Sequence, residues 1–184
     1  MQVNDVKKLI LQAADEIIAN KDYLMAKGFG FTKEALEADF DDYKTLFNKV
    51  ATTLLSKVGG ASGPLYGSFF MKFAASVKDV EDLTRDELNK AFTAGVDGVK
   101  QRGKAEVGDK TMVDVLDPVA EALNAGKSFD DVVKIAEEFM EKTKDIKAKK
   151  GRASYVGERS IGHIDPGAAS SYILVKETLG AIND

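Results

Sequence analysis

The stretch from Thr84 to Val99 reads TRDELNKAFTAGVDGV. It opens with a capping box, in which the Thr hydroxyl and a Glu side chain three positions later each pair with a backbone N–H that the first helical turn leaves free. The apolar residues that follow, Leu88, Phe92 and Val96, lie four positions apart, which is the spacing of one face of a helix. This stretch therefore predicts an amphipathic helix with one buried face.

Helical spacing recurs on both sides of this stretch. It predicts further helices from the amino terminus to about residue 24, over about 25–36, 43–58, 65–77, 111–125 and 167–182, and one more that Ser128 caps. Residues 171–175 have β propensity, but a single strand would find no partner in such a chain. We therefore expect about eight helices with antiparallel, up-and-down neighbours, and an all-α fold.

Composition limits the classes of function. The chain has 184 residues, no cysteine, one histidine and a net charge of −4. Thiolate chemistry and multi-histidine metal sites are excluded, and the acidic balance argues against broad binding to nucleic acid or an acidic membrane. No run of eighteen apolar residues and no apolar signal core is present, so we expect one cytoplasmic domain without a membrane segment.

Residues 151–167, GRASYVGERSIGHIDPG, show neither helical nor alternating apolar spacing. An irregular run of this length inside a compact domain is usually a functional loop. Two other glycine-containing loops, at residues 59–64 and 103–110, follow the predicted third and fifth helices, and this one follows the seventh. In an up-and-down arrangement alternate connections emerge at the same end, so we expect the three loops to meet at one rim.

Several motifs in these segments have two interpretations. The run from Gly59 to Gly63 leads into a helix amino terminus and is either a phosphate-binding loop or a flexible turn. Asp39, Asp41 and Asp42 are either magnesium ligands or, as we prefer, carboxylates that stabilise a helix start.

Three side chains of the 151–167 run are candidates for chemistry. His163 is either a general base or, as is more common for a lone loop histidine, a hydrogen-bonding strut. Arg152 and Arg159 are better candidates, because a guanidinium can pair with phosphate oxygens.

Three segments together carry a resemblance to a known family. They are KVGGASGPLYG at 57–67, RGKAEVGDKTM at 102–112, and the run at 151–167. Their order and separation resemble those of the L subunit of bacterial phosphotransferase-linked dihydroxyacetone kinase, and the similarity extends from about Asn20 to the end. Three long motifs in register make the resemblance specific.

The resemblance implies a fold and a function. The family's fold is a closed barrel of eight antiparallel helices that holds ADP and two Mg²⁺ ions at one rim. The implied activity is a relay, in which a phosphoprotein M subunit rephosphorylates the bound ADP and the resulting ATP passes a phosphoryl group to dihydroxyacetone on a K subunit. The whole chain, 1–184, would be one nucleotide-binding domain with these two subunits as partners.

The resemblance also implies site residues. Gly60, Ala61 and Ser62 would lie at the phosphates, and Gly103 and Met112 would border the adenine and ribose. Arg152 would approach the phosphates as the catalytic residue. The sequence Asp165-Pro166-Gly167 would close the pocket. Covalent attachment of substrate to a histidine belongs to the K subunit, so His163 would not inherit it.

One departure from the family concerns the metal. Family members carry, after the first helix, a loop whose three aspartates bind the Mg²⁺ ions, and here Leu24 is followed directly by Met25. Without these aspartates the chain is expected to bind ADP poorly and to be nearly inactive.

Two explanations of the departure remain. In the first, the full protein carries the loop and this sequence lacks it. We prefer this explanation because all the other site residues are intact. In the second, the chain is a metal-free, non-catalytic module, with a partner such as the transcriptional regulator that some family members contact.

Overall fold

The computed structural model describes residues 1–19 and 23–183, without the side chains of residues 23–28. Within these residues the fold is all-helical, as predicted, and contains no strand. The α-helices are α1 (Val3–Ala19), α2 (Tyr23–Ala35), α3 (Tyr43–Lys57), α4 (Ser62–Ser76), α5 (Arg85–Gly103), α6 (Val113–Asn124), α7 (Phe129–Lys142) and α8 (Pro166–Thr178). Three short 3₁₀ segments follow α7 and α8, namely η1 (Thr143–Asp145), η2 (Arg152–Ser160) and η3 (Leu179–Ala181).

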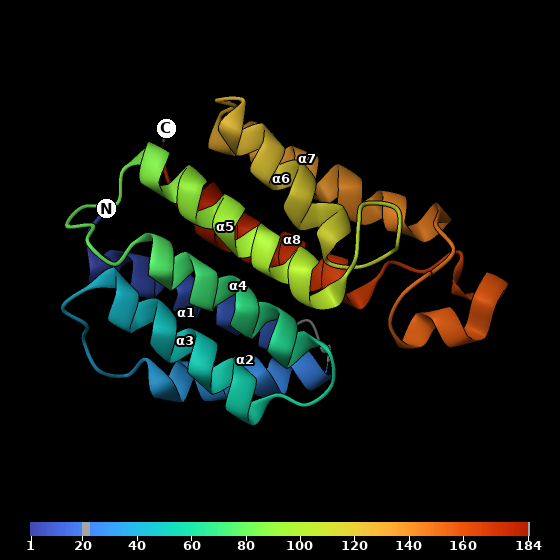
Figure 1. Ribbon diagram of the computed structural model, residues 1–184, viewed down its shortest axis with the longest axis horizontal. Helices are drawn as coiled ribbons and strands as arrows, with labels where there is room; N and C mark the ends of the chain where they lie inside the picture. Colours follow the sequence, from blue (N-terminus) through green and yellow to red (C-terminus); the bar gives the residue numbers. More distant parts are fainter. Residues whose placement is uncertain (20–22, 184) are drawn as a thin grey trace.

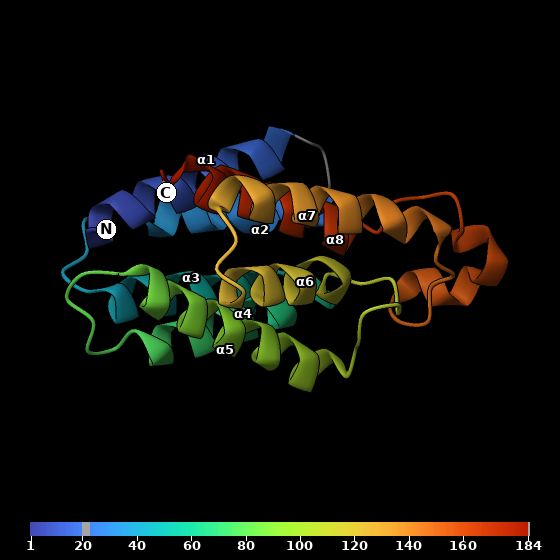
Figure 2. The same cartoon turned by 90° about the horizontal axis from the view of Figure 1, so that it is seen from above.

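The helices form a closed ring. Each helix packs against the next along the chain, and α8 packs back against α1. Successive helices run in opposite directions, as the colour gradient along each ribbon shows (Figures 1 and 2). The predicted barrel of eight antiparallel helices is therefore confirmed for the described residues. Because connections alternate between the two ends, the loops after α3, α5 and α7 share one rim.

The barrel core is apolar and rich in phenylalanine where α3, α4 and α5 meet. Phe47 of α3 lies against Phe73 of α4 with ring centroids 4.3 Å apart. Phe69 of α4 meets Phe92 of α5 edge to face at 5.3 Å. Such pairs stabilise a core beyond the burial of their area. These contacts fix α4, whose amino terminus reaches the rim that carries the three loops.

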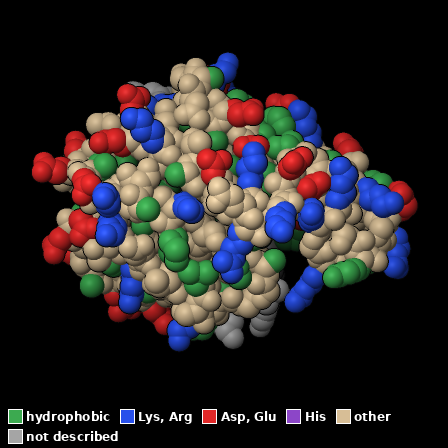
Figure 3. Space-filling view, in the orientation of Figure 1, with side chains coloured by type: hydrophobic (Ala, Val, Ile, Leu, Met, Phe, Trp, Pro, Cys, Tyr) green, Lys and Arg blue, Asp and Glu red, His purple; other side chains and the backbone are tan. Residues whose placement is uncertain are grey.

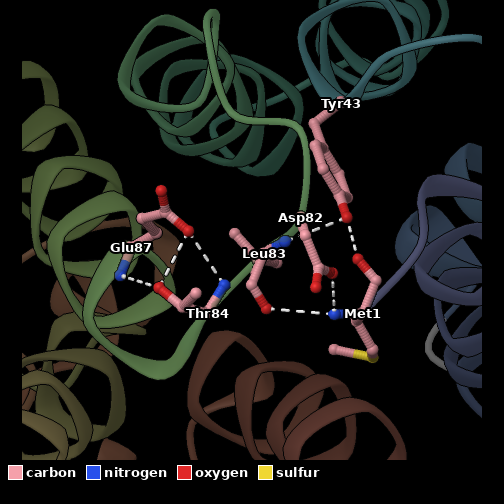
Figure 4. A network of polar contacts seen from close by, with 6 residues as sticks. All are labelled: Met1, Tyr43, Asp82, Leu83, Thr84 and Glu87. Carbon is pink, nitrogen blue, oxygen red and sulfur yellow. Dashed lines mark hydrogen bonds and ion pairs between the residues drawn. The ribbon is translucent and has the colours of Figure 1, made fainter.

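The capping box predicted at Thr84 is present at the other end of the barrel (Figure 4). The Thr84 backbone N–H donates to the Glu87 carboxylate at 2.9 Å, and the Glu87 N–H donates to the Thr84 hydroxyl at 3.4 Å. Beside it, the Tyr43 hydroxyl donates to the Met1 carbonyl oxygen and accepts from the Leu83 N–H at 3.1 Å. These bonds join α1, α3 and the start of α5 at the rim opposite the three loops.

Two boundaries differ from the sequence expectation. The sequence places Leu24 at the end of the first helix, but α2 begins at Tyr23, so the junction between Leu24 and Met25 lies inside α2. The run at 151–167 is not structureless, because Arg152–Ser160 forms the 3₁₀ segment η2, kinked at Gly157 with φ of +58°. A 3₁₀ helix needs only short-range bonds, which apolar periodicity does not reveal. No helix of the described residues is long and apolar enough to cross a bilayer.

Candidate functional site

One cavity of about 520 Å³ opens at the rim where the three loops meet. Its lining comes from the α3–α4 loop with the start of α4, from the end of α5 with the α5–α6 loop, and from the segment between α7 and α8. It includes the nine residues that the resemblance implied for the nucleotide site: Gly60, Ala61, Ser62, Gly103, Met112, Arg152, Asp165, Pro166 and Gly167. The expected convergence of the loops is therefore observed.

The first wall is the amino terminus of α4. Ala61 occupies the N-cap position, and no side chain accepts a hydrogen bond there. The first-turn N–H groups are thus left for water or a ligand, at the positive end of the helix dipole. Gly63 allows this end of α4 to approach α3, because a Cβ at Gly63 would lie 2.4 Å from the carbonyl oxygen of Val58. The start of α4 can therefore lie this close to α3 only because Gly63 has no side chain.

The second wall is the loop between α5 and α6, and Asp114 holds it in shape. The Asp114 carboxylate accepts from the Gly108 N–H at 2.7 Å and from the Thr111 N–H at 2.6 Å. The Asp114 side chain is buried at the start of α6. Met112, also buried, packs so close to Gly167 that a Cβ there would lie 3.3 Å from the Met112 nitrogen. The second and third walls therefore touch at the floor of the cavity.

The third wall is η2 and the turn that leads into α8. Lys110 is 3% exposed, has φ of +63°, and donates from Nζ to the Ser160 carbonyl oxygen at 2.5 Å. The Ser160 hydroxyl donates to the Gly157 carbonyl oxygen at 2.7 Å and accepts from the Ala148 N–H at 2.9 Å. These bonds pin the far end of η2, whose first residue, Arg152, lines the mouth of the cavity and is exposed.

Asp165 is the carboxyl group in the lining. It caps α8 by accepting from the Ala168 N–H at 2.9 Å, and its own N–H donates to the Thr143 hydroxyl at 3.0 Å. Burial raises the pKa of Asp165 to about 6, and the nearby Asp114 charge adds to this rise. The Ala168 and Gly167 N–H groups and the Lys110 charge pull the pKa in the other direction, with smaller effect. The group therefore titrates just below neutral pH.

Several lining residues were missed from the sequence as site residues. They are cationic or polar and include Arg102, Lys110, Thr111 and Lys150. Arg102, Lys110 and Thr111 lie inside the motif at 102–112, so the motif itself was the available signal. Lys150 lies directly before the long loop, among other lysines. The sequence does not show which of these lysines faces the cavity. Arg102, Lys150 and Arg152 are exposed and give the cavity a basic mouth above apolar walls, whereas Lys110 is buried and donates to Ser160.

Other candidate residues lie outside the cavity. His163 and Arg159 are exposed and do not line it. Asp42 caps α3 by accepting from the Thr45 N–H at 2.7 Å, and this hydrogen bond lowers its pKa. Asp39 pairs with Lys7 at 2.7 Å, which lowers the pKa of Asp39 in turn. Asp42 thus lies at a helix start, as the structural interpretation expects, whereas Asp39 joins the segment before α3 to Lys7 of α1.

The arrangement suits an anion that carries an apolar or aromatic body. The amino terminus of α4 and the lysines and arginines of the lining favour phosphate oxygens. The aliphatic walls formed by Leu65, Val99 and Met112 favour a flat ring. No group of three or more His, Asp or Glu side chains that could hold a metal ion occurs among the described residues. The residues present therefore fit a nucleotide and do not fit a pair of Mg²⁺ ions.

Comparison with known families settles the ancestry. The profile of the DAK2 domain matches residues 23–180. The chain belongs to the DAK2 domain family. Among DAK2 proteins it is similar to the ADP-binding subunit DhaL of PEP-dependent dihydroxyacetone kinase 1 from Listeria innocua, with 46% identity over 170 residues that cover 91% of this chain and 84% of that protein. The corresponding subunit from Escherichia coli is 43% identical over 177 residues, covering 90% of this chain and 84% of that protein.

Two solved structures share the fold of this chain. The native dihydroxyacetone kinase of C. freundii superposes with a TM-score of 0.75 at 19% identity, covering 99% of this chain and 36% of that one. The complex of the same kinase with AMP-PNP and Mg²⁺ gives a TM-score of 0.73 at 20% identity, covering 98% and 34%. This chain thus spans about a third of the length of those kinases, and the likeness establishes the shared fold. The predicted membership in the L-subunit family is confirmed.

Proposed function

We propose that this chain is the ADP/ATP-carrying subunit of a dihydroxyacetone kinase and that it relays phosphoryl groups in the cytoplasm. The observation that carries the proposal is the convergence of three separate loops on one cavity with a basic mouth and a helix amino terminus. The names of its relatives, ADP-binding subunits of PEP-dependent kinases, support it. We further propose that residues 1–184 form one nucleotide-binding domain.

In this proposal the nucleotide phosphates lie at Ala61 and Ser62, where the first N–H groups of α4 are free for an anion. Arg152 pairs with phosphate oxygens from the opposite side of the mouth. Gly103 and Met112 border the adenine and ribose along the aliphatic wall. The Asp165-Pro166-Gly167 turn closes the floor, where Gly167 permits the close approach to Met112.

The relay consists of two transfers at the same nucleotide. In the first, a terminal oxygen of bound ADP takes the phosphoryl group of a phosphorylated M subunit and ATP forms. In the second, a hydroxyl oxygen of dihydroxyacetone on the K subunit takes the γ-phosphoryl group, loses its proton, and leaves ADP in place. Arg152 supports both steps, because a fixed guanidinium stabilises charge that develops on the transferred group.

The family implies two Mg²⁺ ions, which would neutralise charge between the β- and γ-phosphates. The described residues offer no carboxylate cluster for them, and α2 runs through the junction of Leu24 and Met25 as one helix. This observation favours a second candidate function. In it the chain is a metal-free module that binds nucleotide or a protein partner, such as a transcriptional regulator, without catalysis.

A reconstituted assay separates the two functions. Purified K and phosphorylated M subunits are combined with this chain and ADP, and dihydroxyacetone phosphate is measured. A second variant carries the aspartate loop of the Listeria innocua relative between Leu24 and Met25, and a third carries a Gly/Ser loop of equal length. Turnover by the unchanged chain supports a relay that works without the loop, whereas turnover only with the aspartate loop supports a relay whose metal ligands the loop supplies. Failure of all three variants contradicts the relay.

A further inference from the structure

The segment that leaves α7 and returns to α8 projects beyond the end of the barrel. We call residues 144–163, which contain η2, the projection. Figures 1 and 2 show its η2 part as the dark-orange lobe at the right-hand end, clear of the eight helices. Within η2 Tyr155 is 88% exposed and Val156 is 41% exposed, and Ile161, directly after η2, is 42% exposed. Apolar side chains gathered at such a place point to a contact with another molecule.

The projection is basic in an acidic protein. It holds six lysines and arginines (Lys144, Lys147, Lys149, Lys150, Arg152 and Arg159) against two acids (Asp145 and Glu158), a local balance of +4. The whole chain has a net charge of −4. Figure 3 shows Lys and Arg side chains around the lobe that lies where Figure 1 draws η2. Lys144, Lys147 and Lys149 pair with Glu141, Glu158 and Asp109, so Lys150, Arg152 and Arg159 are the cations that suit this surface to an acidic partner.

The projection is also held in shape. Besides the bond from Lys110 to Ser160, the Gly162 N–H donates to the Lys144 carbonyl oxygen at 2.7 Å and joins the two arms of the projection at its base. The Lys149 N–H donates to the Asp109 carbonyl oxygen at 3.1 Å and ties the projection to the second wall. Tyr155 is therefore presented on a fixed support, and a preordered surface loses less entropy on binding.

We infer that the projection is the docking surface for the phosphorylated donor protein of the relay, with Tyr155 as the apolar anchor and the surrounding basic side chains facing the phosphoryl-bearing surface. The inference rests on the proposed function. Arg152 and Ala153, which precede Tyr155 in the same segment, line the cavity, so a protein bound here stands at the nucleotide. The acceptor side brings neutral dihydroxyacetone, whereas a phosphorylated donor brings about −1.5 to −2 charges with its phosphoryl group.

This assignment explains how the phosphorylated donor would bind and the unphosphorylated donor would leave. The phosphorylated donor is attracted to the basic projection, and once its phosphoryl group has passed to ADP that part of the attraction is lost. The projection then releases the unphosphorylated donor and frees the mouth for the acceptor. The inference therefore predicts that the chain distinguishes the two forms of the donor by affinity and that added salt reduces the difference.

The test measures binding of the M subunit, phosphorylated and unphosphorylated, to the full chain without nucleotide by calorimetry at low and high salt, so that no phosphoryl group is transferred during the titration. Tyr155→Ala should weaken binding of the phosphorylated form about tenfold or more, because tyrosine anchors dominate such contacts. Arg159→Glu should weaken it as well, and more at low salt than at high salt. The matched controls are Met71→Ala, an apolar side chain 45% exposed on α4, and Lys90→Glu on α5. Both should bind like the unchanged chain.

Affinity for ADP separates this inference from the function on which it rests. Tyr155→Ala should bind ADP like the unchanged chain, since Tyr155 does not line the cavity. If the unchanged chain binds no ADP, the proposed function fails. If it binds ADP but Tyr155→Ala binds the phosphorylated M subunit within twofold of the unchanged chain, the docking surface is overturned. A loss of binding to the K subunit alone overturns it too and assigns the projection to the acceptor.

Discussion

Lys110 Nζ donates a hydrogen bond to the carbonyl oxygen of Ser160 over 2.5 Å, and so ties the loop after α5 to the end of η2. The lysine is buried and is one of two residues other than glycine with positive φ among the described residues; the other is Lys104, on the same loop and exposed. A buried ammonium group held by a main-chain oxygen is costly to disturb. The pair therefore connects the second and third walls of the cavity.

Replacing this lysine tests that connection. Lys110→Met leaves the Ser160 carbonyl oxygen without its donor, so the free energy of unfolding should fall by about 1–3 kcal/mol. Amide exchange in Arg152–Ser160 should also accelerate, whereas exchange in α5 should not. Lys104→Met is the matched control and should change the free energy of unfolding by less than about 0.5 kcal/mol. Equal effects of the two substitutions would show that Lys110 is not a tie.

Arg152 is expected to act on the transferred phosphoryl group. Arg152→Ala should lower the rate of phosphoryl transfer about a hundredfold or more, by analogy with the loss of other charge-stabilising donors. Circular dichroism should show an unchanged helical fold, because the side chain is exposed at the cavity mouth. Arg152→Lys should recover only part of the rate, since an ammonium cannot pair with two oxygens in one plane. An unchanged turnover number for Arg152→Ala in the reconstituted system would refute the assigned role.

The raised pKa of Asp165 gives stability a pH dependence of known sign. The pKa is about 6 in the folded state against 3.8 for the ordinary carboxyl group, so between these values the folded state holds a proton that the unfolded state has lost. Stability from this group is thus present at low pH and is lost as the pH rises through about 6.

Asp165→Asn isolates this contribution. The amide oxygen can still accept from the Ala168 N–H, so the helix cap is retained while the titration is removed. Melting temperatures of the two proteins are compared across the range from acid to neutral pH. The difference should move in favour of the variant as the pH rises. A difference that stays constant with pH would mean that Asp165 titrates at its ordinary value.

Gly63 tests the close approach of α3 and α4. In most helical positions alanine is preferred to glycine, but a Cβ at Gly63 would lie 2.4 Å from the Val58 carbonyl oxygen and 2.9 Å from that of Leu54. Gly63→Ala should therefore destabilise the fold by about 1–3 kcal/mol and displace the first turn of α4. Gly59→Ala, whose Cβ would meet nothing within 4 Å, is the control and should melt near the unchanged chain. A stable Gly63→Ala protein would contradict this packing.

The sequence predicts much of this architecture because helices leave local signals. The capping box at Thr84, the cap at Ser128 and the apolar faces set most helix positions, and the order of the loops predicts which end they share. Sequence patterns assign Leu24 to the first helix, whereas Leu24 belongs to α2, because apolar spacing alone does not mark a boundary between two helical stretches. They do not reveal η2, because its short-range bonds leave no apolar period and the bond that fixes its end, from Lys110 to Ser160, joins residues 50 positions apart. The burial that shifts the pKa of Asp165 likewise depends on tertiary contacts.

Titration of ADP into the purified chain by calorimetry tests the central claim most directly, namely that the cavity formed by the three loops is a nucleotide site. The account predicts weak but saturable binding at one site per chain, competed by ATP and weakened further by Arg152→Ala. Because the described residues hold no metal cluster, chelating Mg²⁺ should change the affinity little. Absence of saturable ADP binding by a folded, fully helical chain would contradict the account.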